Sequence, residues 1–574
     1  MNEKTDSSFF ETVYFILIIS IVLALITLVF SYMRYIDFFT ENWDLGINMQ
    51  QLWTTTHGYL LYDSGDFEGY GVLSHLEVHS TFIAYPISYI YAMFPGPLIL
   101  FTIQSFVVFL SVPVLYLLSF QITQDRKIAM MSSLIYGFNA TLITAVLYDY
   151  HWLSFMPILS FSFFYFILKK NYLLASLILI LGLITEEAFS FISVSILIYV
   201  YMSDIGFSLH EIVGKVRRGS KMILLFVLSI SLYLFLSYIQ HNVIPQMLNN
   251  VSAIHILLSK TGQPIFPPSD IIYRIPGSLA YWFFSLSMLC FIPLFHKKTI
   301  YLVFIWLIET LIFVPHYTTI GSQYSFVTLS LLAPAIPAGL RSIRARFSEF
   351  RLKRIILLLP IIPVGFIIAS STNKFSMVFI SVQSLMFTIA ITIAAVILIV
   401  YFVNKLDLKK IHKILINRKK MVYITFLTLI LLMNFLFSPL NPENDNQVHL
   451  LGGGFKFQYA INPESKFMVD IQDKVGTSSS IVASNDLFPY IANDRFAYAL
   501  SNSTYSGSTI FPFNNTYLPT YILLSGVQEK YAFSWVLNDL PKYGIVEEII
   551  YDEYPGNITL WQLGFNGNAT YYYA

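Results

Sequence analysis

Cysteine and charge are both scarce in this chain of 574 residues. The single cysteine, Cys290, lies in an apolar run, which excludes an intrachain disulfide, a cysteine-based metal site and a thioredoxin-like motif. Charged residues make up 12% of the sequence, against roughly 25% in a typical soluble domain. No basic run alternates with aromatic residues, so we expect no nucleic-acid partner, and a net charge of +1 indicates no particular partner.

Apolar residues dominate instead. Hydrophobic residues account for 56% of the chain and aromatic residues for 17%, and the mean hydropathy is +0.65. Abundant Phe and Tyr suit lipid-facing surfaces and interfacial belts. We therefore predict a mostly α-helical, multi-pass protein of the cell membrane, with the lipid bilayer as its surroundings. The first apolar run, about Phe15–Tyr32, has no Ala-x-Ala-type cleavage site after it and is expected to remain as a signal anchor.

Runs of about 17 or more apolar residues are long enough to cross a bilayer as helices, and they predict about 13 transmembrane helices. A shorter run, 81–94, is bounded by Pro86 and Pro95. We expect it to lie on the membrane surface or dip into it, within a large first loop over 34–97. The predicted spans lie near residues 12–33, 98–120, 128–147, 151–168, 171–185, 187–203, 222–240, 275–295, 299–314, 325–340, 354–371, 375–402 and 421–438.

Basic residues are distributed unevenly among the predicted loops. If the N-terminus is cytoplasmic, the inner side holds 24 Lys and Arg residues, whereas the outer loops between spans hold four. The positive-inside rule therefore predicts a cytoplasmic N-terminus. Asn-x-Ser/Thr sequons are a weaker indicator, and we assign all of them to the outer side: Asn139, Asn250, Asn502, Asn514, Asn557 and Asn568.

The texture of the sequence changes at about residue 439, where Gly-, Asn- and Pro-rich stretches replace apolar runs. We predict a transmembrane domain over 1–438 and an extracytoplasmic α/β domain over 439–574. The second domain is expected to cap the first or to position a substrate, without chemistry of its own. Its predicted strands are 480–483, 521–524, 545–550 and 558–563, and its predicted helices are 464–474 and 530–540.

Acidic and imidazole groups recur where the predicted outer loops meet the membrane. Asp44 follows the first span. Its carboxylate could act on a substrate at the membrane surface, or it could cap the helix predicted to begin there. Asp149 and His151 could both reach a divalent ion or a phosphate from an extended turn. The aromatic residues beside them could equally be interface anchors.

Further candidates lie at other outer borders. Glu186 and Glu187 interrupt an apolar stretch, as ligand groups or as a solvated turn. The alternation of His75, Glu77 and His79 would place three possible metal ligands on one face of an extended segment.

A last outer loop opens with His316 and Tyr317 and ends in Gln323-Tyr324. His316 is a candidate acid/base or phosphate contact. Arg274 stands at a predicted helix start, where it could bind a phosphate or anchor the helix at the interface.

These acidic residues belong to a longer pattern in the first part of the chain. It comprises Trp43-Asp44-Leu45-Gly46, Gln51-Leu52-Trp53, His79, Tyr148-Asp149-Tyr150-His151 and Glu186-Glu187-Ala188. The pattern resembles a family of uncharacterised polytopic prokaryotic membrane proteins that looks like a distant branch of the GT-C-type glycosyltransferases. Those enzymes include the oligosaccharyltransferase catalytic subunits and the protein O-mannosyltransferases. The match covers about 30–200 and extends more loosely to the His316 loop.

The resemblance implies an inverting transfer of a sugar from a polyprenyl-phosphate donor to an extracytoplasmic acceptor. It gives Asp44 the place of the acid that binds the acceptor or acts as base. Asp149 and His151 would hold the donor phosphate, directly or through Mg²⁺ or Mn²⁺. The chain departs from the GT-C pattern in having Asp-x-His rather than two acids here, and in lacking a Trp-Trp-Asp-type motif near the C-terminus. The substrate-binding residues would be His79, Glu186, Glu187, Arg274, His316 and Tyr317.

Two other functions are compatible with the sequence. A transporter or flippase for a lipid or small solute would use its acids to relay protons or bind cations near the membrane midplane, where Glu309 is one of few charges. A non-catalytic scaffold on the same fold is the third possibility. What distinguishes a shared catalytic site is convergence of Asp44, Asp149, His151 and Glu186 or Glu187 on one cavity.

Overall fold

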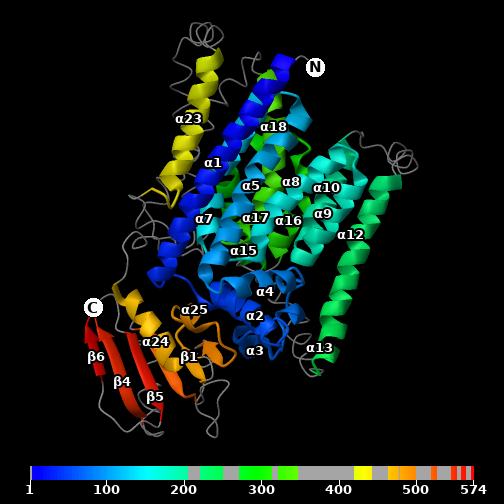
Figure 1. Cartoon of the computed structure of the whole chain (residues 1–574). Coiled ribbons are helices and arrows are strands. Elements are labelled where there is room, and N and C mark those ends of the chain that lie inside the picture. The colour runs from blue at the N-terminus through cyan, green and yellow to red at the C-terminus, as the bar shows by residue number, and fades with distance from the viewer. Residues whose placement is uncertain are drawn as a thin grey trace.

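The computed structural model describes residues 3–203, 220–249, 271–312, 321–346, 419–441, 463–476, 479–499, 519–525, 545–552, 558–563 and 570–573. A bundle of long helices forms most of the molecule, and a β-sheet lies at the end of the bundle opposite the N-terminus (Figure 1). Short helices of the first loop lie at this same end of the bundle, beside the sheet: α2 (Ile47–Thr56), α3 (Ser64–Tyr70) and α4 (Ala84–Met93).

The predicted membrane spans within the described residues are helical, which confirms the mostly α-helical class. Among the described residues, four helices are long and apolar enough to cross a membrane, or five if the bent pair α6–α7 is one span. The predicted total of 13 is not confirmed, and the predicted spans 354–371 and 375–402 lie outside the described residues. The bundle among the described residues is built from helices of different lengths, not all of them long enough to cross a membrane alone. They are α1 (Glu3–Ile36), α5 (Pro97–Thr123), α6 (Arg126–Gly137), α7 (Ala140–Leu147), α8 (Met156–Leu168), α9 (Tyr172–Thr185), α10 (Phe189–Ser203), α12 (Ser220–Tyr238), α15 (Ile271–Met288), α16 (Thr299–Ile312), α17 (Ser325–Leu332), α18 (Ile336–Arg346) and α23 (Lys419–Phe437).

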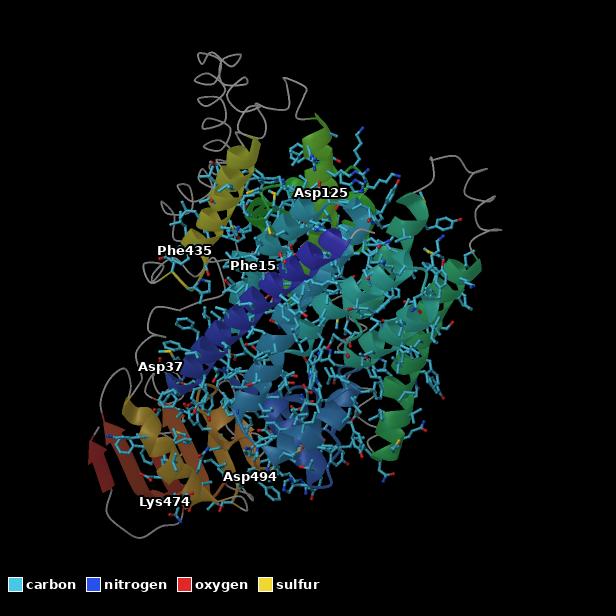
Figure 2. All side chains as sticks on the ribbon, turned by 45° about the horizontal axis from the view of Figure 1, so that its top comes forward. Phe15, Asp37, Asp125, Phe435, Lys474 and Asp494 are labelled. Carbon is cyan, nitrogen blue, oxygen red and sulfur yellow. The ribbon has the colours of Figure 1, made fainter. Side chains whose placement is uncertain are left out.

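Polar side chains decide where several helices begin. Asp125 caps α6 by accepting from the N–H groups of Lys127 and Ile128, and Figure 2 shows it at the opposite end of the bundle from Asp37. Asn139 caps α7 where the α6–α7 pair bends by 43°. Asn139 is fully buried, so its sequon gives no support to the predicted orientation, which stays a prediction. A cap side chain inside the helical core cannot carry a glycan in the folded protein.

Helix α23, far along the chain, contacts the bend between α6 and α7. Asn434 on α23 accepts from the Ala140 N–H at 2.9 Å and donates to the Met288 carbonyl at 3.0 Å. The first bond satisfies an N–H group that the break between α6 and α7 would leave unpaired inside an apolar bundle, and the second satisfies the carbonyl of the last residue of α15. They also fix α23 against α7 and α15.

The C-terminal region contains a six-stranded mixed sheet in the order β2-β1-β3-β5-β4-β6. β1 pairs in parallel with β2 and β3, β5 pairs antiparallel with β3 and β4, and β6 pairs in parallel with β4. The four predicted strands are present, and two short strands were not predicted. The predicted helix over 464–474 appears as a 3₁₀ turn (Pro463–Lys466) and α24 (Phe467–Val475), and that over 530–540 lies outside the described residues. The strands are β1 (Ile481–Ala483), β2 (Ala497–Ala499), β3 (Tyr521–Ser525), β4 (Ile545–Asp552), β5 (Ile558–Leu563) and β6 (Thr570–Tyr573).

The sheet region shares an apolar core with the first loop. Tyr490, on α25 (Phe488–Ile491), stacks on Tyr35 with 4.2 Å between ring centroids and donates its hydroxyl to the Tyr35 carbonyl at 2.5 Å. The Gln50 amide donates to the carbonyls of Asp494 and Ala497 at 2.7 and 2.9 Å. These contacts hold the described part of the C-terminal region against the loop that carries Asp44.

Gly182 on α9 lies directly against Phe189 of α10. A Cβ added there would lie 2.2 Å from Cδ1 of Phe189, a buried ring. We expect Gly182→Ala to lower the free energy of unfolding by about 1–3 kcal/mol because the core must be overpacked. Thermal unfolding of the detergent-purified protein measures this. Leu177→Ala, on the same helix with Leu177 53% exposed, is the control, and equal melting temperatures for the two variants would contradict the close packing.

Candidate functional site

Asp44 and His151 form a hydrogen-bonded pair between the first loop and the turn after α7. Asp44 lies in a π-helical turn (Asn42–Gly46) that runs directly into α2. Its Oδ1 is 2.6 Å from Nε2 of His151, and both side chains are 14% exposed. The alternative role of Asp44 as a helix cap is wrong, because Gly46 is the N-cap of α2 and no side chain caps it. The carboxylate is therefore available to the imidazole.

Asp149 faces away from this pair and binds Arg34. Its Oδ1 is 3.1 Å from Arg34 Nη1, and its Oδ2 accepts from the Glu41 N–H at 2.9 Å. The Arg34 and Asp149 side chains are only 8% and 3% exposed. Arg34 also donates to the carbonyls of Leu147 and Phe39. Burial raises the pKa of Asp149, and the Arg34 guanidinium opposes that rise.

Gln104, inside α5, fixes the turn that carries Asp149 and His151. Its amide nitrogen donates to the carbonyls of Val146 and Asp149 at 2.9 and 2.8 Å, and its oxygen accepts from the His151 N–H at 2.9 Å. Sequence reasoning missed Gln104 and the structural role of Arg34. The available signal was the presence of an amide within the apolar run over 98–120 and of a guanidinium at the end of the first span, since such groups need partners.

His79 meets both acids of the turn between α9 and α10. Its Nδ1 is 2.7 Å from Glu187 Oε1 and 3.6 Å from Glu186 Oε1. Ser80 donates its N–H and its hydroxyl to Glu187 Oε2 at 3.1 and 3.2 Å. The Ile83 N–H donates to the Ile184 carbonyl at 2.9 Å, which ties the two segments together.

The expected extended triad of His75, Glu77 and His79 is wrong. His75–Glu77 is a 3₁₀ turn rather than an extended segment, although the rings of His75 and His79 lie close together, with 5.3 Å between their centroids. Glu77 accepts from the Leu73 N–H, whereas His75 Nδ1 lies 2.6 Å from Asp66 Oδ2. Backbone hydrogen bonds within this segment form a turn, so its side chains do not alternate between two faces as they would in an extended strand.

The candidate residues from these separate segments line one cavity of about 570 Å³. Asp44, His151, His79, Glu186 and Glu187 all face it, whereas Asp149 is not among its lining residues. The convergence expected of a shared site is therefore met by Asp44, His151, Glu186 and Glu187 but not by Asp149, and His79 joins these four. The described lining also includes Glu41, Asn48, Asp66, His75, Tyr148, Trp152, Glu309, Gln323 and Tyr324.

The electrostatics of the cavity follow from burial and from its carboxylates. Burial lowers the pKa of the His151 imidazole, but Asp44 outweighs this effect and the pKa is raised. Burial likewise lowers the pKa of His79, and Glu187 and Glu186 raise it to about 10. Burial raises the pKa of Glu187, but His79 lowers it to about 2. Burial and the Glu187 charge raise the pKa of Glu186 well above its usual value.

Two groups of described residues have the ligand types and spacing to hold a metal ion. They are Asp63, Asp66 and His75, and His79, Glu186 and Glu187. The predicted metal ligands Asp149 and His151 are in neither group. The Asp149 carboxylate pairs with Arg34, and the His151 imidazole is hydrogen-bonded to Asp44. Their assignment to a metal stays a prediction.

The remaining predicted site residues are less well placed. Arg274 lies in the first turn of α15, where the structure describes the backbone alone. His316 and Tyr317 lie outside the described residues, although Gln323 and Tyr324 at the end of the same predicted loop line the cavity.

Residues 34–390 match the family described as "Predicted membrane protein (DUF2079)". The chain belongs to this family. The match confirms the expected membership of an uncharacterised family of membrane proteins, and the apolar helices agree with it. No curated protein matches the sequence significantly.

Solved structures similar to the chain include two crystal structures of ArnT from Cupriavidus metallidurans. The one bound to undecaprenyl phosphate has a TM-score of 0.49 at 11% sequence identity, covering 96% of this chain and 98% of that one. The one in the apo state has the same TM-score and identity, with coverage of 95% and 97%. Similarity at this level identifies neither the activity nor the substrate of this family member.

Proposed function

We propose that this protein transfers a sugar from a polyprenyl-phosphate donor to an acceptor hydroxyl on the extracytoplasmic side of the membrane. The observation that carries the proposal is the Asp44–His151 pair, 2.6 Å apart and facing the same cavity as His79, Glu186 and Glu187. A carboxylate oriented by an imidazole is suited to accept a proton from a bound hydroxyl. The sequence-based orientation, with the N-terminus cytoplasmic, would place this cavity outside.

Asp44 would act as the general base. It takes the proton from the acceptor hydroxyl as that oxygen bonds to the anomeric carbon of the sugar. The bond between the anomeric carbon and the phosphate oxygen breaks, and polyprenyl phosphate leaves with the electron pair. His151 would hold the Asp44 carboxylate in place, and His79 with Glu186 and Glu187 would contact the donor end of the site. A divalent cation, Mg²⁺ or Mn²⁺, is the expected cofactor for the phosphate.

A second, smaller cavity supports access from the lipid. It measures about 260 Å³ and shares Tyr70, Val78 and Glu187 with the main cavity. Its apolar lining comes from Leu183 on α9 and from Tyr233 and Leu236 on α12. Because α12 has only 17% of its apolar window buried, a lipid chain could reach Glu187 along this side of the bundle.

The transporter alternative finds less support. A transporter would need charged residues near the membrane midplane, and Glu309 was the candidate for that position. In the structure Glu309 lies in the last turn of α16 and lines the same cavity as the other acids. The described ionisable groups of the cavity thus gather at one end of the bundle, near the first-loop helices.

Release of polyprenyl phosphate tests the proposal. The purified protein is supplied with a polyprenyl-phosphate sugar, and the wild type is compared with Asp44→Asn and Asp149→Asn. We expect release by the wild type and strong loss in Asp44→Asn. Equal release by all three proteins would refute a catalytic role, and uptake of a labelled lipid or solute into vesicles without release would favour transport.

A further inference from the structure

The cluster of His79, Glu186 and Glu187 has the arrangement of a three-ligand cation site. One imidazole nitrogen and an oxygen from each carboxylate lie within 4.8 Å of one another. The ligands come from two segments more than a hundred residues apart, and the bond between the Ile83 N–H and the Ile184 carbonyl joins those segments at 2.9 Å. The donor atoms are thus brought together by the fold rather than by one flexible loop.

Outer contacts hold one of these ligands in position. Ser80 occupies Oε2 of Glu187 with two hydrogen bonds and leaves Oε1 directed at His79. Hydrogen bonds of this kind orient a metal ligand in advance and reduce the reorganisation needed for binding. The His79 side chain is 43% exposed and Glu187 30% exposed, so an ion has a path from the cavity and room to retain water ligands.

The charge of the cavity independently indicates a cationic ligand. Among the described residues that line it there are six carboxylates and three imidazoles, and none is Lys or Arg. A phosphate-bearing donor would be repelled from such a surface unless a cation lay between them. The side-chain oxygen of Gln323, another lining residue, is buried and has no hydrogen-bond partner among the described residues.

We infer that His79, Glu186 and Glu187 bind a divalent transition-metal ion that bridges the protein to the phosphate of the donor. The phosphate contact rests on the proposed function, whereas the ion site rests on the side-chain geometry. A ligand set of one imidazole and two carboxylates suits Mn²⁺ or Zn²⁺ better than Mg²⁺ or Ca²⁺, which prefer oxygen ligands throughout.

The other possible cluster is a structural one. Asp63 caps α3 by accepting from the Asp66 N–H, and Asp66 holds His75 at 2.6 Å. The three side chains are at most 6% exposed. Their hydrogen bonds already serve the folding of the first loop, so we assign the ion to the more accessible cluster of His79, Glu186 and Glu187.

Titration of the full-length, detergent-purified protein with Mn²⁺, after removal of bound metal with a chelator, tests the site. Electron paramagnetic resonance reports the free ion. We expect one Mn²⁺ per chain in the wild type, and affinity weakened about tenfold or more in Glu186→Gln and in His79→Gln. Glu41→Gln removes a carboxylate from the Asp44 side of the same cavity and is expected to change affinity by less than about threefold. Millimolar Mg²⁺ should compete poorly.

Three results of the Mn²⁺ titration would each overturn the assignment. The first is a wild type that does not bind Mn²⁺ stoichiometrically, and the second is unchanged affinity in both Glu186→Gln and His79→Gln. The third is loss of binding in Asp66→Asn with retention in Glu186→Gln. Melting temperatures measured without metal verify folding, and His79→Gln carries the test if Glu186→Gln does not fold. Loss of Mn²⁺ binding in the cluster variants together with a wild type that releases no polyprenyl phosphate would refute the proposed function and leave the ion site standing.

Discussion

Replacing Asp44 with Asn is expected to lower the rate of sugar transfer by about 10²–10⁴-fold, the usual contribution of a positioned general base. The amide has nearly the same shape as the carboxylate and can still accept from His151 through its oxygen. It cannot take up a proton from the acceptor. The loss should therefore fall on kcat, with KM for the donor changed by less than about threefold.

The replacement of His151 by Gln provides the matched comparison. His151 contacts Asp44 at 2.6 Å but acts by orienting that carboxylate, so we expect a smaller loss than in Asp44→Asn. The double variant should be no slower than Asp44→Asn alone, because the two residues act as a unit. Additive losses would show that His151 contacts the substrate independently, and full activity in Asp44→Asn would remove Asp44 from the chemistry.

The same pair predicts the direction of a pH effect on stability. Asp44 raises the pKa of His151 above its usual value, so the folded protein holds the imidazole proton to higher pH than the unfolded chain. This stabilisation is complete below about pH 6.5, the unfolded value, and is lost as the pH rises through the folded value. We expect the stability difference between wild type and Asp44→Asn to shrink above about pH 6.5 in thermal unfolding experiments. A difference that grew with pH would contradict the charged pair.

Hydropathy predicts most of the fold because each membrane helix must satisfy its backbone within itself. The runs near 98–120 and 171–185 became α5 and α9 with ends shifted by a few residues. The sheet was harder to predict. β2 has only three residues and is defined by its pairing with β1 rather than by a pattern of its own.

The sequence identified several of the residues that line the cavity, but it did not identify their hydrogen-bond partners. The sequence placed acids and imidazoles at loop borders on one side of the membrane. Four of these residues, Asp44, His79, His151 and Glu187, line one cavity in the structure. Their partners could not be predicted, because each pair joins residues more than a hundred positions apart. The pairing of Asp149 with Arg34 rather than with a metal is the main example. Sequence spacing makes Asp149 and His151 neighbours, but the turn points their side chains to opposite partners.

The Arg34–Asp149 pair gives the second large expected effect. Replacing Arg34 with Met is expected to lower the free energy of unfolding by about 3–5 kcal/mol, because it leaves a buried carboxylate without its counter-charge. The carbonyls of Leu147 and Phe39 also lose a donor. Denaturant or thermal unfolding in detergent measures the loss. Because burial and the Asp44 charge raise the pKa of Asp149, the unpaired carboxyl can take up a proton, so the loss should be smallest at low pH.

Two comparisons separate the buried charge from a general effect of losing an arginine. Arg344 pairs with Asp125 at the other end of the bundle, where the side chains are 55% and 25% exposed, so Arg344→Met should cost only about 0–1 kcal/mol. In the double variant of Arg34→Met with Asp149→Leu, both charges are gone, and part of the stability should return. If Arg34→Met and Arg344→Met cost the same, or if the double variant is less stable than Arg34→Met, the buried pair does not hold the end of α1 to the turn that carries His151.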